Sequence, residues 1–205
     1  KLKPLRFPEA NRPRSFKIAS WNIGAGELVK IQLEAMLSDE SLDVLCIQEP
    51  FGSSETNPWK LNINKNYHYL FSKPSIVHTI DGTPTTCTSK IIEGRKKCES
   101  GCDIIHRHGL VTYVHKRYHY PVIIKVDSPI SIETMVMNII ADGKKLTLLN
   151  TYVNHAARIR DVKSISSIFK GNNISPDYIG CGDYNSHHAY WNCAKDITDD
   201  DEEVT

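Results

Sequence analysis

The sequence predicts one α+β domain in which helices cover β-sheets, and three observations support this fold class. The chain has 205 residues, a length suited to one hydrophobic core. Short apolar segments of the strand type outnumber segments with helical spacing. Two strand-like segments flank Asp142–Gly143, a dipeptide that favours the type I′ turn of a β-hairpin. Strands, hairpins and helices in one short chain indicate a mixed architecture.

The first half of the chain predicts three strands with one helix among them. The helix is indicated by Val29, Leu33 and Leu37, which recur at helical spacing. One strand is an apolar run that stops before Pro50. The elements expected here are strands over 15–23, 42–50 and 67–71 and a helix over 27–37.

An irregular, polar insertion containing cysteines and histidines is expected near 73–108, followed by further strands and a second helix. Ile159, Val162 and Ile165 share one face of that helix. The elements expected here are strands over 109–115 and 120–126, the hairpin strands within 131–153, a helix over 157–169 and a last strand over 178–183.

The two ends of the chain carry opposite charge. Residues 1–17 contain six Lys or Arg against one Glu, and residues 196–203 contain six Asp or Glu and no basic residue. We therefore expect a basic arm, a central domain and an acidic tail, both ends being solvated. The boundaries expected are 1–15, 16–195 and 196–205.

Composition and targeting signals bear on the compartment. Apolar residues make up 40% of the chain, no apolar run reaches the length of a membrane span, and no signal-peptide pattern is visible. We expect an intracellular protein without membrane contact whose six cysteines are mostly reduced thiols.

Five polar residues lie at or just past the carboxyl ends of predicted strands. Strand ends meet at a sheet edge, so side chains distant in sequence can share one pocket there. These residues are Asn22, Glu49, Tyr152, Asp183 and Asn185.

Their chemistry suits phosphodiester hydrolysis with a hard divalent cation. Glu49 can be a ligand of Mg²⁺ or Mn²⁺, and Asp183 can be either a ligand or the group that orients the attacking water. The remaining three residues can donate to phosphate oxygens. On an extended backbone Asp183 and Asn185 would point to the same face. Simpler roles stay open: Glu49 can end a strand, Asn22 can cap a helix, and Tyr152 can be a sheet residue.

Five sequence motifs carry a resemblance to a known family. They are SWNI, IQEP, HGLVTYV, NTYV and GDYNSHHAYW, and they span Phe16 to Trp191. Their order resembles the endonuclease/exonuclease/phosphatase superfamily, which has the deoxyribonuclease I-like fold. The last motif is most similar to the endonuclease domains of non-LTR (LINE-type) retrotransposons. The resemblance implies a four-layer sandwich of two mixed β-sheets flanked by helices.

The resemblance also implies roles and partners. Asn22 matches an active-site asparagine, Glu49 the main metal ligand and Tyr152 a phosphate contact, while Asp183 and Asn185 match a paired Asp-x-Asn motif. The cofactor would be Mg²⁺ or Mn²⁺. The protein would nick target DNA in the nucleus, and a reverse transcriptase domain would follow in the full-length protein.

Three departures from the family pattern affect this interpretation. Gly24 replaces an aspartate that lies near the metal in many relatives, and Asn154 and His155 replace a Pro-Asn pair. The sequence contains no Ser-Asp-His motif, which supplies the family's catalytic histidine. We therefore expect a domain that lacks its last strands and has little activity by itself.

Further residues are candidates for nucleic-acid contact. His187 and His188 follow the Asp-x-Asn pair, and Arg95, Lys96 and Lys97 give the insertion positive charge. Zinc at the Cys98, Cys102 and His106 region is the less favoured alternative: the Cys98–Cys102 spacing is inside the usual range for a zinc site, but ten residues separate Cys87 from Cys98. A loop with reduced thiols is expected instead.

Two other functions stay open. One is a different phosphodiesterase or phosphatase on this fold, such as an abasic-site nuclease. The other is a non-catalytic or decayed nucleic-acid-binding fragment, a hypothesis favoured by Gly24 and the missing Ser-Asp-His motif.

Overall fold

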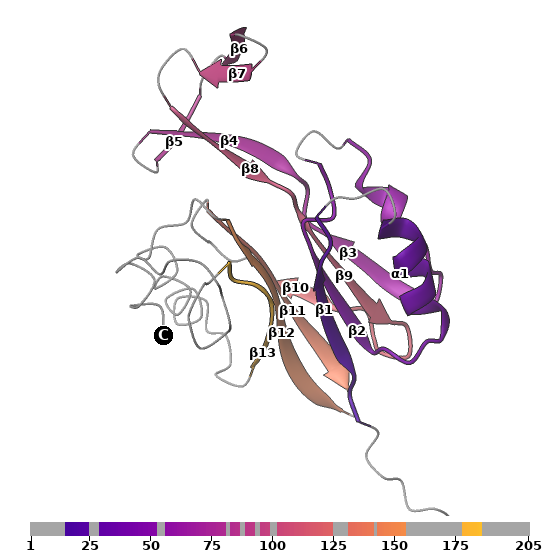
Figure 1. Cartoon of the computed structure of the whole chain (residues 1–205). Helices are drawn as coiled ribbons and strands as arrows, with labels where there is room; N and C mark the ends of the chain where they lie inside the picture. The colour runs from indigo at the N-terminus through magenta and orange to yellow at the C-terminus, as the bar shows by residue number, and fades with distance from the viewer. Residues whose placement is uncertain are drawn as a thin grey trace, which may run out of the picture.

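The computed structural model describes residues 15–24, 29–52, 56–80, 83–86, 89–92, 95–98, 102–124, 131–141, 143–154 and 178–185. In these residues two four-stranded sheets form the framework (Figure 1). The first sheet has the strand order β1-β2-β9-β3 and the second has the order β10-β11-β12-β13.

The first sheet begins with a parallel pair joined through a helix. Strands β1 and β2 pair in parallel, and α1 lies between them in the chain, as a parallel connection requires. Strand β9 is antiparallel to both of its neighbours. The elements are β1 (Ile18–Asn22), α1 (Val29–Ser38), β2 (Val44–Gln48), β3 (Tyr67–Phe71) and β9 (Leu110–His115), with a 3-10 helix η1 (Pro58–Leu61) before β3.

Strand β2 is buried on both faces, which explains its unbroken apolar sequence. Leu45 and Ile47 pack with Leu33 and Leu37 of α1. The alternate residues of β2 point the other way, into the core between the two sheets. That core combines Val44, Cys46, Leu70, Leu110 and Val114 with Met135, Met137, Ile139, Leu148 and Tyr152.

The second sheet contains the predicted hairpin. Ala141 pairs with Lys144, so two residues connect the strands, and Gly143 has φ of +72°. Strands β12 and β13 pair in parallel. The elements are β10 (Val122–Ile124), β11 (Ile132–Ala141), β12 (Lys144–Val153) and β13 (Tyr178–Asp183). The helix expected over 157–169 lies outside the described residues.

The prediction of an irregular insertion over 73–108 is wrong, because this segment contains five strands. A three-stranded sheet of order β5-β4-β8 and a β6–β7 hairpin form an arm that extends away from the two main sheets (Figure 1). Ser75 pairs with Arg107, more than thirty positions later. Local composition does not report such distant pairing. The strands are β4 (Ser75–Ile80), β5 (Thr83–Thr85), β6 (Ser89–Ile92), β7 (Arg95–Cys98) and β8 (Asp103–Arg107).

In the described residues α1 is the one α-helix, and it covers the first sheet. Among the helices of this described part, none has the length and hydropathy that crossing a membrane requires.

Candidate active site

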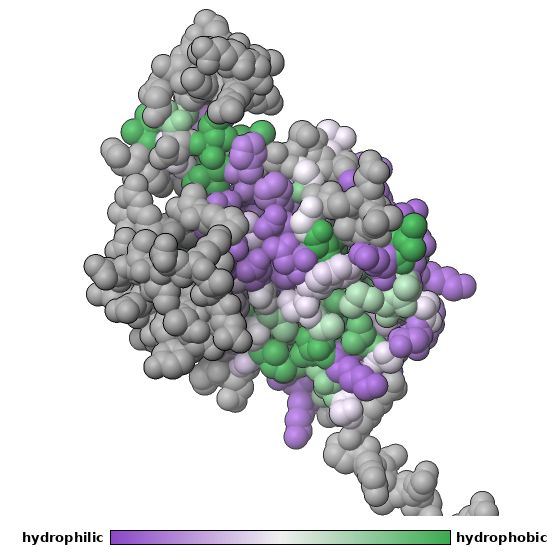
Figure 2. Space-filling view, viewed as in Figure 1, coloured by the Kyte–Doolittle hydropathy of each residue, from purple (hydrophilic) through white to green (hydrophobic). Residues whose placement is uncertain are grey.

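The five polar residues at strand ends meet at one edge of the paired sheets. Asn22 ends β1, Glu49 follows β2, Tyr152 lies near the end of β12, and Asp183 ends β13. Each parallel pair of strands brings two carboxyl ends to this edge. On the face shown in Figure 2, hydrophilic residues gather where the arm joins the main sheets.

Asn22 links the two carboxylates across the two sheets. Its Nδ2 donates to Glu49 Oε1 at 3.1 Å and to Asp183 Oδ2 at 2.6 Å. Its Oδ1 accepts a hydrogen bond from the backbone N–H of Gly24 at 3.1 Å. The bond from Gly24 orients the Asn22 amide so that its nitrogen faces the two carboxylates.

Tyr152 places a protonated phenol beside the carboxylates of Glu49 and Asp183. Burial and a hydrogen bond to the Glu49 carboxylate raise the pKa of Tyr152, while its contact with Asn185 acts in the opposite direction. The phenol therefore keeps its proton at neutral pH and can donate a hydrogen bond.

Two residues of the site adopt a left-handed backbone, which is costly for a residue with a side chain. Glu49 has φ of +52° and Asn185 has φ of +47°. In the described part of the chain, only Glu40 is another non-glycine residue with positive φ. Backbone strain of this kind is common where geometry serves a function. Here it lets Glu49 turn its carboxylate toward Asn22 directly after a buried strand.

The expected extended backbone from Asp183 to Asn185 is wrong, although both residues do lie at the site. Strand β13 ends at Asp183, and Asp183 Oδ1 accepts the backbone N–H of Asn185 at 2.9 Å, forming a turn. Asn185 Nδ2 donates to the Val153 carbonyl at 2.6 Å. Tyr184, between them, is 40% exposed.

Gly182 allows β13 to approach β12 closely. A Cβ atom at this position would lie 2.1 Å from the carbonyl oxygen of Thr151, so any larger residue would push the strands apart. The close approach sets Asp183 opposite Tyr152 in the ladder.

Two buried polar residues behind the site were missed by the sequence analysis. Gln48 Nε2 donates to Asn150 Oδ1 at 2.6 Å, and Asn150 Nδ2 donates to the Val111 carbonyl at 2.9 Å. Both side chains are almost completely buried and join β2 to β12 across the core. In the sequence, each is an amide within an apolar strand and close to a predicted site residue. Gln48 directly precedes Glu49, and Asn150 lies two residues before Tyr152.

A buried carboxylate, also missed, fixes the root of the arm near the site. Glu133 lies opposite Tyr152 in the ladder and is 3% exposed. Its two oxygens accept the backbone N–H groups of His108 and Gly109, each at 2.9 Å. Burial raises the pKa of Glu133, and Arg107 opposes that rise.

The other predicted contact residues fall in different places. Arg95, Lys96 and Lys97 belong to β7, which pairs with β6 in the arm. His187 and His188 lie outside the described residues. Cys102 Sγ lies 3.4 Å from His78 Nδ1. The described residues hold no group of three or more His, Cys, Asp or Glu able to bind a metal, and the expectation about zinc stays a prediction.

Comparison with known proteins identifies the family. The profile of the Endonuclease/Exonuclease/phosphatase family matches residues 19–199, most of the chain. The chain belongs to this family. Endonuclease/exonuclease/phosphatase proteins are hydrolases that act on phosphate esters, including phosphodiesters, and generally use a divalent metal such as Mg²⁺. No curated protein sequence matches the chain.

Solved structures agree with this family assignment at the level of the fold. The endonuclease domain of TRAS1, a telomere-specific non-LTR retrotransposon, matches with a TM-score of 0.53 and 14% identity, over 93% of this chain and 68% of that one. A humanized TDP2 of D. rerio matches with a TM-score of 0.52 and 16% identity, over 87% of this chain and 66% of that one. An AP endonuclease from Archaeoglobus fulgidus matches with a TM-score of 0.50 and 16% identity, over 93% of this chain and 68% of that one. The chain thus spans about two thirds of these structures and has the deoxyribonuclease I-like fold.

The residues of the site fit the divalent metal of this family. Mg²⁺ usually takes one or two protein carboxylates and keeps its other positions for water and phosphate. Glu49 and Asp183 supply two carboxylates within hydrogen-bond distance of one amide nitrogen. Their like charges, brought this close, would be stabilised by a cation.

Proposed function

We propose that this protein is a divalent-metal-dependent endonuclease that nicks DNA, of the type found in non-LTR retrotransposon proteins. The observation that carries the proposal is the Asn22 amide bonded to both Glu49 and Asp183, with the Tyr152 phenol beside them. This is a set of oxygen ligands next to neutral donors, as a metal-bound phosphodiester needs.

Each residue has a separate role in the proposed reaction. Glu49 and Asp183 would hold the metal, which supplies positive charge to the phosphate. Asp183, held on both oxygens, would also orient the attacking water. Tyr152 would donate a hydrogen bond from its phenol to a non-bridging phosphate oxygen, and Asn22 would keep both carboxylates in place.

Several observations support DNA as the substrate and a retrotransposon protein as the source. The GDYNSHHAYW motif is most similar to that branch of the family, and the TRAS1 endonuclease domain shares the fold. A TDP2 structure in complex with a single-strand DNA product is also similar in fold, with a TM-score of 0.51. The arm adds the basic strand β7. A nuclear location and an accompanying reverse transcriptase domain belong to the same proposal.

The proposal is tested by Glu49→Gln in a nicking assay on supercoiled plasmid DNA with Mg²⁺. This assay detects one nick per plasmid, so even a slow rate is measurable. We expect a loss of about 100-fold or more in rate, because the metal loses a charged ligand, while DNA affinity stays within about twofold.

Glu34→Gln on the exposed surface of α1 removes the same charge away from the site and should nick at the wild-type rate. A wild-type rate in Glu49→Gln, or nicking that persists in EDTA, would refute the metal-dependent mechanism. A plasmid containing abasic sites tests substrate class, because strong preference for it would favour an abasic-site nuclease.

A further inference from the structure

A cavity of about 710 Å³ opens at the edge of the sheets opposite the candidate active site. It lies where β12 begins, whereas the active site lies where β12 ends. Tyr152 lies eight positions after Lys144 on an extended strand, a distance of about 26 Å. The cavity is lined by Phe16, Arg117, Tyr118, His119, Ile140, Ala141, Gly143, Lys144, Lys145, Leu146 and Ile179.

The rim of this cavity carries unbalanced positive charge. Lys144 and Lys145 are exposed, and within the described ranges neither has an ion-pair partner. His119 is also exposed, and none of the described residues that line the cavity is acidic. Asp142, between Ala141 and Gly143 in the sequence, lies outside the described residues. A concave surface with charge of one sign attracts a ligand of the opposite sign.

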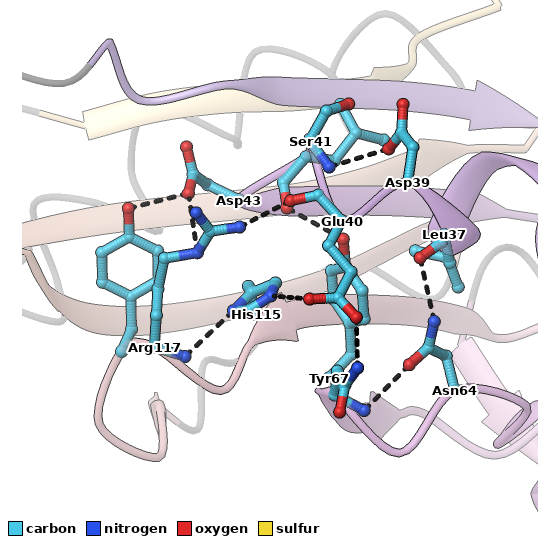
Figure 3. A network of polar contacts seen from close by, with 12 residues as sticks. Leu37, Asp39, Glu40, Ser41, Asp43, Asn64, Tyr67, His115 and Arg117 are labelled. Atoms are coloured by element: carbon cyan, nitrogen blue, oxygen red, sulfur yellow. Dashed lines mark hydrogen bonds and ion pairs between the residues drawn. The ribbon is translucent and has the colours of Figure 1, made fainter.

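Arg117 has a structural role in the wall. Its Nε lies 3.4 Å from Asp43 Oδ1, and its Nη2 donates to the Glu40 carbonyl at 2.7 Å, as Figure 3 shows. His115 contacts the Glu40 carboxylate in the same network. These bonds hold the loop after β9 against the segment before β2. The wall is therefore preformed, and the lysines are left to bind a ligand.

The interior of the cavity is aromatic and aliphatic. Phe16 and Tyr118 are in edge contact, with ring centroids 5.3 Å apart. Leu146 and Ile179 add aliphatic surface, and Ile179 is 37% exposed. Cations around an apolar, aromatic concavity suit a ligand that has both phosphates and flat bases.

The sequence that precedes Phe16 is basic. Residues 1–14 contain five Lys or Arg. In the sequence they are followed by Ser15 and then by Phe16 of the cavity wall. This continuity favours a polymeric polyanion over a small anion. A duplex hides its base faces in the stack, whereas a single strand exposes them to an apolar pocket.

We propose that this cavity binds a single-stranded nucleic acid, with phosphates on Lys144 and Lys145 and a base against Phe16, Tyr118 and Ile179. The cavity is separate from the candidate active site, so this binding does not depend on the proposed nuclease activity.

The experiment measures binding of a fluorescein-labelled oligo(dT) 15-mer by anisotropy, in EDTA, which keeps metal-dependent binding at Glu49 from contributing. The variant Lys144→Glu/Lys145→Glu is compared with Lys30→Glu/Lys65→Glu, which makes the same charge change at exposed positions on α1 and before β3. We expect the first pair to weaken binding at least tenfold and to reduce the salt slope by about 1.4, for two lost phosphate contacts. The control pair should change affinity less than threefold, and circular dichroism checks folding.

A second variant tests the cavity without changing charge. Ala141→Trp fills the space and should also weaken oligo(dT) binding at least fivefold. Equal effects of the two lysine pairs, or unchanged binding in Ala141→Trp, would overturn the proposal. So would polyglutamate of matched charge competing as well as unlabelled oligo(dT), because the cavity would then recognise charge alone. A blunt duplex of the same length should bind more weakly than the single strand, and tighter binding of the duplex would also contradict the proposal.

Discussion

Glu49 and Asn185 show how single residues shape the candidate site, because both carry a side chain on left-handed backbone. Asparagine tolerates this conformation better than most residues, and its side chain can bond locally. At Asn185 the amide also donates to Val153, which ties the turn to β12. The residue therefore combines a backbone requirement with a hydrogen bond, and the two can be separated by substitution.

Replacing Asn185 by alanine or by glycine separates these contributions. Both variants lose the amide, but only alanine keeps the strain of φ at +47°. We expect Asn185→Ala to be less stable than Asn185→Gly by about 1 kcal/mol in urea denaturation. Nicking should fall by roughly ten- to hundredfold in both. Equal stability of the two variants would show that the turn relaxes and that strain is not stored there.

Asp183 and its neighbour Tyr184 are expected to differ sharply in nicking. Asp183→Asn removes the negative charge proposed to hold the metal and the attacking water, so turnover should fall at least 100-fold. Tyr184→Phe removes a hydroxyl that contacts Thr151 and none of the proposed site residues, so its rate should stay within about twofold. The measurement is single-turnover nicking with folding checked by thermal melting. Equal damage from both variants would contradict the proposed pocket.

At the scale of elements, the arm depends on one buried carboxylate at its root. Glu133 on β11 binds the two backbone N–H groups that lead from β8 into β9. Gly109 in this link has φ of +75°, and a Cβ there would lie 2.6 Å from the Ser72 carbonyl oxygen. The position of the arm beside the site therefore depends on local bonds between distant strands.

Glu133→Ala should destabilise the protein by about 3 kcal/mol in urea denaturation, because two buried N–H groups lose their acceptor. Glu133→Gln keeps one acceptor oxygen and should cost less. Burial raises the pKa of Glu133 in the folded state above its ordinary value of 4.5. Folding therefore favours the protonated form of Glu133. The stability that this protonation contributes is present at acidic pH and is lost as the pH rises through the folded-state pKa of Glu133. The stability advantage of wild type over Glu133→Gln should therefore shrink from acidic to neutral pH; a growing advantage would contradict it.

At the scale of the whole molecule, the two main sheets are joined by a mixed interface. Most of it is apolar, but Gln48 and Asn150 form a polar pair within it. Asn150 also donates to the Ile47 carbonyl at 3.2 Å, in addition to Val111. This pair fixes how β2 and β12 lie relative to each other, and so it fixes the separation of Glu49 and Tyr152.

A double-mutant cycle measures this link. Asn150→Leu leaves Gln48 Nε2 with only its bond to Ser20 Oγ and should cost about 2–4 kcal/mol. Gln48→Leu/Asn150→Leu should cost less than the sum of the single changes by at least 1 kcal/mol. Asn138→Leu is the control, since Asn138 bonds Thr147 within one sheet and is partly exposed. Additive costs in urea denaturation would show that the pair does not act as a unit.

The sequence by itself determined the strands that make up the two main sheets and the approximate place of the site. Periodicity and turn chemistry are local, so the apolar run of β2 and the two-residue turn before Lys144 could be predicted without tertiary contacts. The strand-end rule then indicated which of the polar residues would share an edge. Those predictions required only neighbours within about ten positions.

Only the tertiary structure decided the rest, because it depends on contacts between residues far apart in the chain. The bond from Asn22 to Asp183 spans 161 positions, and β4 of the arm pairs with β8, Ser75 lying opposite Arg107. The left-handed backbone at Glu49 and the turn at Asn185 are stable because those distant partners hold them. The cavity where β12 begins combines Phe16, Lys144 and Ile179, which no local pattern connects. Local propensity selects elements, and long-range hydrogen bonds and packing select where their side chains meet.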